Sequence, residues 1–162
     1  MSELLDAIAG VPNASEPIPG VVTGGQPTTE HLAALKRAGC EVVLDCRDPM
    51  EPRPCQPEDI VQAGLEYVCI PVGHTRGSDE TLTKIRDVLK RSVGKRKLFC
   101  HCAGGNRSGA ALIPYLILDQ EFTEEEAVNA AMRMGMRSAE LMEWALDYVR
   151  RQQAVGRPQA DA

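Results

Sequence analysis

Short apolar runs and helical patterns alternate along the first hundred residues of the chain. Runs of strand length occupy 21–23, 41–46, 65–72 and 98–101. Segments with apolar residues at helical spacing span 2–9, 28–39, 57–63 and 79–93. Because strands that alternate with helices join through helical crossovers, the pattern predicts a single α/β domain: a mostly parallel sheet of four to five strands, flanked by helices.

The last third of the chain contains only helical patterns. A strongly apolar segment over 107–120 predicts the central buried helix. Thr123 and Glu126 have the spacing of a capping box, which predicts a helix that runs to about Met134. A last amphipathic helix begins at Ser138.

The length of 162 residues suits one domain with a substantial core. We expect the folded domain to cover 1–151 and a flexible tail to cover 152–162. The segment 10–19 is rich in Pro, Asn and Ser, which predicts irregular structure over one face of the domain.

One stretch, 98–109, concentrates the chemistry of the chain. It reads as a strand, a nucleophile at Cys102, two glycines, and then Arg107 at the start of a helix. A glycine-rich turn that leads into a helix N-terminus binds anions, because amide N–H groups converge there and the helix dipole adds positive potential. The same field favours the thiolate form of a cysteine, and the arginine supplies a planar fork of donors for an oxyanion.

Charge and composition exclude several other classes of function. The formal net charge is −5, which argues against a nucleic-acid surface, and no apolar run is long enough to span a membrane. Six cysteines in a core-rich chain predict free thiols and a reducing cytoplasm. Cys100 and Cys102 flank His101 on a strand, where side chains alternate in direction, so we expect no metal site and no cofactor.

The motif resembles the phosphate-binding loop of the dual-specificity-like cysteine phosphatases. The residues that carry the resemblance are His101-Cys102-x-x-Gly105-x-Arg107-Ser108. The Gly-Gly-Gln-Pro entry at 24–27 and the strands at 42–47 and 67–72 also match, over roughly 10–150. Together they are similar to a bacterial family of phosphatase-like domains first noted beside β-lactamase-like hydrolases, once a domain of unknown function.

The resemblance implies a role for each residue of the loop. Cys102 attacks phosphorus, Arg107 stabilises the equatorial oxygens, and Ser108 hydrogen-bonds the sulfur to ease its departure. His101 orients the loop through its ring and helps to keep the thiolate. The substrate is bound by the amides of the loop and by Arg107. The loop residues are Ala103, Gly104, Gly105 and Asn106.

Separately, ligand sites of open α/β sheets lie beyond the carboxyl ends of the strands, so the charged residues after the strand at 41–46 are candidates to reach the site. Arg47 is expected as a further substrate contact. The others are Asp48, Glu51 and Arg53, for which a solvated surface loop is the alternative.

The general acid does not match the family pattern, which places an Asp after the third strand. This chain has Gly73-His74 there, and His74 is our first candidate because imidazole changes charge near neutral pH. Asp79 is the next candidate, although its position suits the first turn of a helix better. Asp48 is the third, on proximity alone.

The spacing of the loop leaves a second function open. Four residues separate Cys102 from Arg107, where the phosphatase motif has five, and a Cys-x4-Arg loop is also similar to the rhodanese sulfurtransferases. A sulfurtransferase carries a persulfide on the cysteine and needs no strong general acid. The partners are then a sulfane-sulfur donor and a thiol acceptor, in place of a phosphorylated protein or small phosphate ester. A non-catalytic anion-binding module is the third possibility.

The remaining cysteines have a simpler interpretation. Cys46, Cys69 and Cys100 fall in the strand runs, which predicts inert core residues. The alternative is that one of them resolves an oxidised Cys102.

Overall fold

The computed structural model describes residues 2–155. In chain order the elements are α1 (Glu3–Ala7), β1 (Ser15–Ile18), β2 (Val21–Gly24), α2 (Thr29–Arg37), β3 (Cys40–Asp45), α3 (Pro57–Gln62), β4 (Glu66–Cys69), α4 (Asp79–Ser92), β5 (Lys97–His101), α5 (Asn106–Leu118), α6 (Glu124–Met134) and α7 (Ala139–Val155). The sequence therefore placed every helix and four of the five strands.

The five strands form one sheet in the order β1-β2-β5-β3-β4. Strands β2, β5, β3 and β4 run parallel, and β1 is antiparallel to β2. This confirms the α/β class and the mostly parallel sheet. The central strand is β5, so its carboxyl end opens between the ends of β2 and β3, where ligand sites of parallel sheets are found.

Regular structure extends into two segments for which the sequence predicted none. The segment 10–19 is not wholly irregular, because Ser15–Ile18 pairs with β2 as an edge strand. Proline within a run weakens the strand signal, but Pro17 is tolerated at a sheet edge, where no partner needs its N–H. The predicted tail begins too early, since α7 continues through 152–155; the rest of that tail lies outside the described residues.

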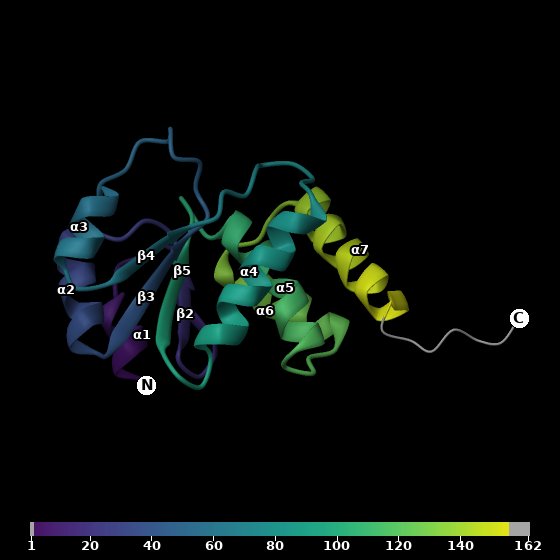
Figure 1. Ribbon diagram of the computed structural model, residues 1–162, viewed down its shortest axis with the longest axis horizontal. Helices are drawn as coiled ribbons and strands as arrows, with labels where there is room; N and C mark the ends of the chain where they lie inside the picture. The colour runs from purple at the N-terminus through teal and green to yellow at the C-terminus, as the bar shows by residue number, and fades with distance from the viewer. Residues whose placement is uncertain (1, 156–162) are drawn as a thin grey trace, which may run out of the picture.

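Helices cover both faces of the sheet, as Figure 1 shows. Helices α1, α2 and α3 lie on one face, where Val22, Val43 and Phe99 point into a small core. Helices α4 to α7 lie on the other, over a larger core that includes Leu44 and the sulfur side chains of the central strands. Side chains of β5 alternate between these cores, so Cys100 and Cys102 belong to one face and His101 to the other.

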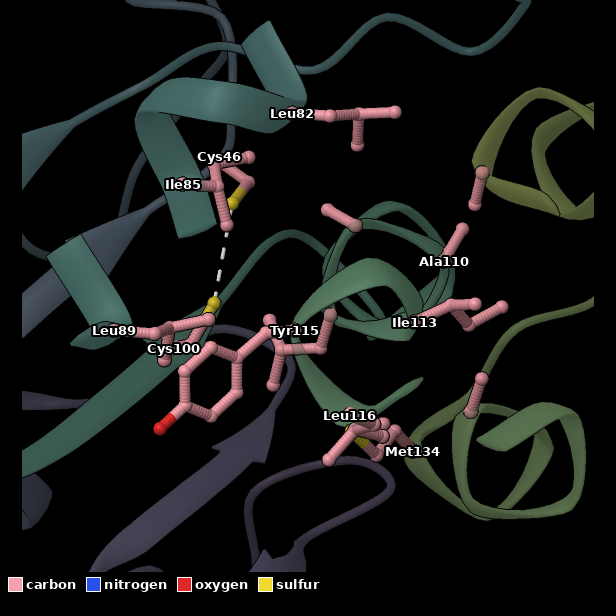
Figure 2. Close-up of a cluster of buried hydrophobic side chains, with 14 of the residues drawn as sticks. Cys46, Leu82, Ile85, Leu89, Cys100, Ala110, Ile113, Tyr115, Leu116 and Met134 are labelled. Carbon is pink, nitrogen blue, oxygen red and sulfur yellow. Dashed lines mark hydrogen bonds between the residues drawn. The ribbon is translucent and has the colours of Figure 1, made fainter. Parts of the chain in front are cut away.

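Helix α5 is the buried centre of the second layer. Ten of its thirteen residues are buried, and it packs on α4, α6 and α7. Figure 2 shows Ala110, Ile113 and Leu116 directed from α5 into the apolar cluster. A helix buried on all sides is held firmly, which fixes the loop that precedes it.

Candidate active site

The loop between β5 and α5 wraps around the sulfur of Cys102. Gly105 has φ of +96°, a conformation that favours glycine, and it turns its amide N–H toward the thiol. That N–H donates to Cys102 Sγ at 3.1 Å, and Ser108 Oγ donates to the same sulfur at 3.5 Å. The thiol is 1% exposed. Donors from the loop and from the first turn of α5 are therefore aimed at one sulfur, an arrangement that stabilises a thiolate.

Segments far away in the sequence hold the loop from outside. Asn13 Nδ2 donates to Gly104 O at 2.8 Å, and the N–H of Gln26 donates to Ala103 O at 3.2 Å. A Cβ atom on Gly25 would lie 2.6 Å from Ala103 O, so the Gly-Gly-Gln-Pro turn needs glycine to approach the loop. These contacts direct loop carbonyls outward and leave its amides free to face the sulfur.

The side chain of Asn106 is used for structure. Its Oδ1 accepts the N–H groups of Arg137 at 2.7 Å and Ser138 at 3.1 Å, which ties the start of α5 to the start of α7. The sequence predicted that Asn106 binds substrate. Because its side-chain oxygen is committed to residues 137–138, that role is left to its donors, the Nδ2 group and the backbone amide.

Arg107 forms a two-pronged ion pair with Glu51. Arg107 Nη1 donates to Glu51 Oε1 at 2.5 Å, and Nη2 donates to Oε2 at 3.1 Å. The arginine is 3% exposed, whereas the side chain of Glu51 is 25% exposed. The hydrogen bonds from Arg107 lower the pKa of Glu51, so the carboxylate stays charged. An anion thus already lies on the guanidinium that is expected to bind an oxyanion.

His74 lies on the outer side of the same carboxylate. Its Nε2 is 3.9 Å from Glu51 Oε1, and its side chain is 72% exposed. The β4–α4 loop brings it there because Val72 continues the pairing of β4 with the end of β3, through an N–H bond of 2.9 Å to Cys46 O. One line of contacts therefore runs from the buried guanidinium of Arg107, at the start of α5, through Glu51 to the exposed ring of His74.

The two alternative acids have other partners. Asp79 receives two hydrogen bonds from Arg151 of α7, at 3.0 and 2.6 Å, and it sits in the first turn of α4. Asp48 Oδ1 accepts the N–H of Met50 at 2.8 Å and shapes the loop after β3. Neither contact involves Cys102 or Arg107.

The side chain of Arg47, expected as a further substrate contact, is held by partners within the protein. Arg47 is 1% exposed, and its side chain donates to Asp45 through Nε at 3.0 Å and Nη2 at 3.1 Å, and to Gln26 at 2.8 Å. A buried guanidinium needs a carboxylate partner, and Asp45 supplies it at the end of β3. Tyr67 also donates to Asp45, at 2.8 Å. The sequence signal for this network was an aspartate that ends an apolar strand two residues before an arginine.

His101 is neutral and acts on the backbone. Burial lowers the pKa of His101 to about 4, so the ring carries no charge near neutral pH. Its Nδ1 lies 3.3 Å from Cys102 O, which accepts the hydrogen bond, and the ring stacks on Phe99 with centroids 5.1 Å apart. The ring is therefore placed to fix the peptide of Cys102, as expected, but it offers no positive charge to a thiolate.

All six cysteines are unpaired. Cys46 Sγ and Cys100 Sγ approach to 3.9 Å in the larger core, as Figure 2 shows. The hydrogen bond with Cys100 and burial raise the pKa of Cys46 well above its usual value, so it remains a protonated core thiol. Among residues 2–155, no three His, Cys, Asp or Glu side chains gather in a metal-binding group.

A separate hollow lies at the opposite end of the sheet. It measures about 410 Å³ and is lined by Gly20, Gly39, Glu41 and the basic turn 95–97, at the starts of the parallel strands. It therefore shares no residue with the loop of Cys102. Within the part of the chain that the structure describes, no helix has the length and apolar character needed to cross a membrane.

Solved structures with the same architecture come from cysteine phosphatases. A candidate phosphatase of the DUF442 family from Shewanella putrefaciens matches with a TM-score of 0.77 and 18% identity, over 91% of this chain and 97% of that one. The active form of Tk-PTP matches with 0.73 and 24% identity, over 86% and 98%. PTPMT1 in complex with PI(5)P matches with 0.76 and 16% identity, over 89% and 99%. The chain has the fold of these phosphatases.

Comparisons at the level of sequence give nothing further. No protein-family model and no curated protein matches the chain. The similarity therefore rests on the fold, and the residues of the site have to be argued from their own geometry.

Proposed function

We propose that the chain is a cysteine-dependent phosphatase that hydrolyses phosphate monoesters through a cysteinyl-phosphate on Cys102. The observation that carries the proposal is the convergence of the Gly105 N–H and the Ser108 hydroxyl on one sulfur, with Arg107 five residues after it. Such a loop stabilises the nucleophile before reaction and the equatorial oxygens of phosphorus during it. The fold shared with known cysteine phosphatases supports the same conclusion.

The first half-reaction transfers the phosphoryl group. The Cys102 thiolate attacks phosphorus as the bond to the leaving oxygen breaks, and the loop amides and Arg107 hold the other three oxygens. His74 supplies the proton to the leaving oxygen in this proposal, because it is the one of the three candidate acids whose side chain pairs with Glu51, the partner of Arg107. Its exposure suits a group that must meet the ester side of the substrate.

The second half-reaction releases inorganic phosphate. Water attacks phosphorus and gives a proton back to His74, while the S–P bond breaks and the thiolate re-forms. Ser108 eases this step, since its hydroxyl already donates to the departing sulfur. The substrate is a phosphorylated protein or a small phosphate ester; the ligand named with PTPMT1, PI(5)P, belongs to the second kind.

A sulfurtransferase is the second candidate, and the length of the loop favours it. Only four residues separate Cys102 from Arg107, and Gly73-His74 stands where the phosphatase pattern has an Asp. In that reaction Cys102 takes a sulfane sulfur as a persulfide and passes it to a thiol. A smaller ring of amides suits this smaller guest.

One pair of assays separates the candidates. The protein is assayed with p-nitrophenyl phosphate and, in parallel, with thiosulfate and cyanide, and Cys102→Ser is the control for both. We expect phosphate release that disappears in the variant. Thiocyanate formation without phosphate release would replace the phosphatase by the sulfurtransferase, and no turnover in either assay would leave an anion-binding module.

A further inference from the structure

One carboxylate oxygen of Glu51 faces both the guanidinium of Arg107 and the imidazole of His74. Its Oε1 accepts from Arg107 Nη1 at 2.5 Å and lies 3.9 Å from His74 Nε2. Exposure increases along the line, from 3% at Arg107 through 25% at Glu51 to 72% at His74. We propose that Glu51 changes partner during the reaction: the substrate phosphate takes Arg107, and the released carboxylate then binds and orients His74 as the proton donor. This inference rests on the proposed function.

The contacts of Glu51 in the absence of substrate give a reason for the exchange of partners. Glu51 occupies both terminal nitrogens of a guanidinium that is otherwise buried, and the thiol beneath is 1% exposed. A phosphate dianion carries more charge than a carboxylate and also gains the loop amides, so it competes well for Arg107. Glu51 itself is only part-buried, and its departure from Arg107 removes a negative charge from beside the incoming one.

The surroundings leave His74 as the next partner of Glu51. Facing Glu51 are Arg107 from α5 and His74 from the β4–α4 loop, and on its own loop Asp48 contributes its carbonyl to the Glu51 N–H at 3.0 Å. The other arginines of these two loops have partners elsewhere, and Arg47 is held by Asp45. Arg76 donates to Asp147 at 2.7 Å, and Arg53 donates to Tyr67 at 2.8 Å.

The role of Glu51 at His74 is positioning and not proton transfer. A carboxylate paired with an imidazolium stabilises its charged form and fixes the direction of its N–H. The proton moves from His74 to the leaving oxygen as the S–P bond forms, and it returns from water in the second step. Glu51 takes no proton in either step.

The first test measures anion affinity without turnover. Inorganic phosphate is titrated calorimetrically into the wild-type protein, Glu51→Gln, and Glu58→Gln, which removes an equal charge from the first turn of α3. We expect Glu51→Gln to bind phosphate about threefold to fivefold more tightly, as befits the loss of a competing, part-exposed ion pair. Unchanged or weaker binding, or an equal gain in Glu58→Gln, would show that Glu51 does not compete for Arg107.

The second test measures how strongly the rate depends on the leaving group, because a poor leaving group needs the proton donor more than a good one does. We compare kcat/KM for phenyl phosphate, a poor leaving group, with kcat/KM for p-nitrophenyl phosphate, a good one. In Glu51→Gln we expect kcat/KM for phenyl phosphate to fall about tenfold more than kcat/KM for p-nitrophenyl phosphate. In a His74→Ala background the same substitution should cause no further change in this ratio. A Glu51 that served only to hold Arg107 in place would lower both values equally and would weaken phosphate binding.

The two proposals fail in different ways. If Cys102→Ser retains the wild-type hydrolysis rate, the phosphatase proposal is wrong, while the phosphate titration still reports whether Glu51 occupies the anion site. If hydrolysis depends on Cys102 but the leaving-group ratio is unchanged in Glu51→Gln, the phosphatase stands and the exchange of partners is wrong.

Discussion

Gly105 lies against the carbonyl group of Met134, at the point where the anion loop meets the end of α6. A Cβ atom on Gly105 would stand 2.0 Å from Met134 O, and the residue has φ of +96°. No side chain fits there, because both the space and the backbone conformation exclude it. The loop and the α6–α7 turn are therefore packed as one unit.

Replacement of Gly105 by alanine is expected to destabilise the protein by about 2–4 kcal/mol, through overpacking and a strained left-handed residue. Gly104→Ala is the matched control, since a Cβ there meets nothing within 4 Å. Urea unfolding of both variants gives the comparison. Equal stability of the two would mean that the loop is not packed against α6 as the structure has it.

Arg107→Lys keeps the charge and loses the planar fork. A lysine cannot hold two oxygens in parallel, so we expect kcat for p-nitrophenyl phosphate to fall about 10²–10³-fold. Thermal unfolding of the variant checks that the fold persists. Near wild-type turnover would show that the guanidinium does not bind the reacting phosphoryl group.

Asn106→Ala is expected mainly to lower the free energy of unfolding. The change leaves the N–H groups of Arg137 and Ser138 without their acceptor, which costs about 0.5–1.5 kcal/mol because water reaches these exposed and part-buried groups. Asn106→Asp retains an acceptor and serves as the control. Denaturant unfolding reads the difference, and an alanine variant as stable as the aspartate would remove Asn106 from its anchoring role.

His101 makes stability depend on pH. The folded ring has a pKa of about 4 against 6.5 when unfolded, so the unfolded chain binds the extra proton between these values. Stability is therefore complete above pH 6.5 and falls as pH drops toward 4, by roughly 3 kcal/mol. His101→Asn should flatten the curve of unfolding free energy in that window. Parallel curves for the two proteins would contradict a buried neutral imidazole.

Asp45 is expected to be essential for the fold. Asp45→Asn removes the charge partner of the buried Arg47, which costs about 3–5 kcal/mol, whereas Asp119→Asn breaks a more exposed pair with Arg86 and costs about 1 kcal/mol or less. Burial raises the pKa of Asp45, but the hydrogen bonds from Arg47 outweigh it and keep that pKa below its usual value, so the contribution of Asp45 is present above pH 3.8 and is lost below it. Urea unfolding of both variants at neutral pH measures the difference.

Most of the fold could be predicted from the periodicity of apolar residues, because this periodicity reports directly which face of each helix or strand is buried. The runs at 41–46 and 98–101 fall on β3 and β5, and the capping box at Thr123 starts α6. The edge strand β1 was not predicted. Only one of its sides is paired, so it tolerates a proline and partly exposed side chains, and these weaken the sequence pattern of a strand. Composition alone cannot separate such a strand from a loop.

The loop of the candidate site was readable for a different reason. A glycine-rich turn between a strand and a helix has few possible shapes, so Cys102, Gly105 and Arg107 could be placed relative to one another. Contacts between segments that are distant in the sequence could not be predicted in this way. Their position after β3 placed Arg47 and Glu51 near the site, but nothing local to them shows that Arg47 turns inward to Asp45 or that Glu51 pairs with Arg107. Such pairs depend on how two loops meet across strand ends.

The order of the strands also governs when the site can exist. The strand in the middle of the sheet, β5, is the last one to leave the ribosome, and its neighbours are made long before it. A nascent chain that stops short of residue 97 holds two half-sheets with open edges, which invite aggregation until the missing strand arrives. Since the nucleophile follows that strand directly, the strand that joins the two half-sheets and the thiol are made together, and the loop around Cys102 is completed only after α5 and α6 have followed.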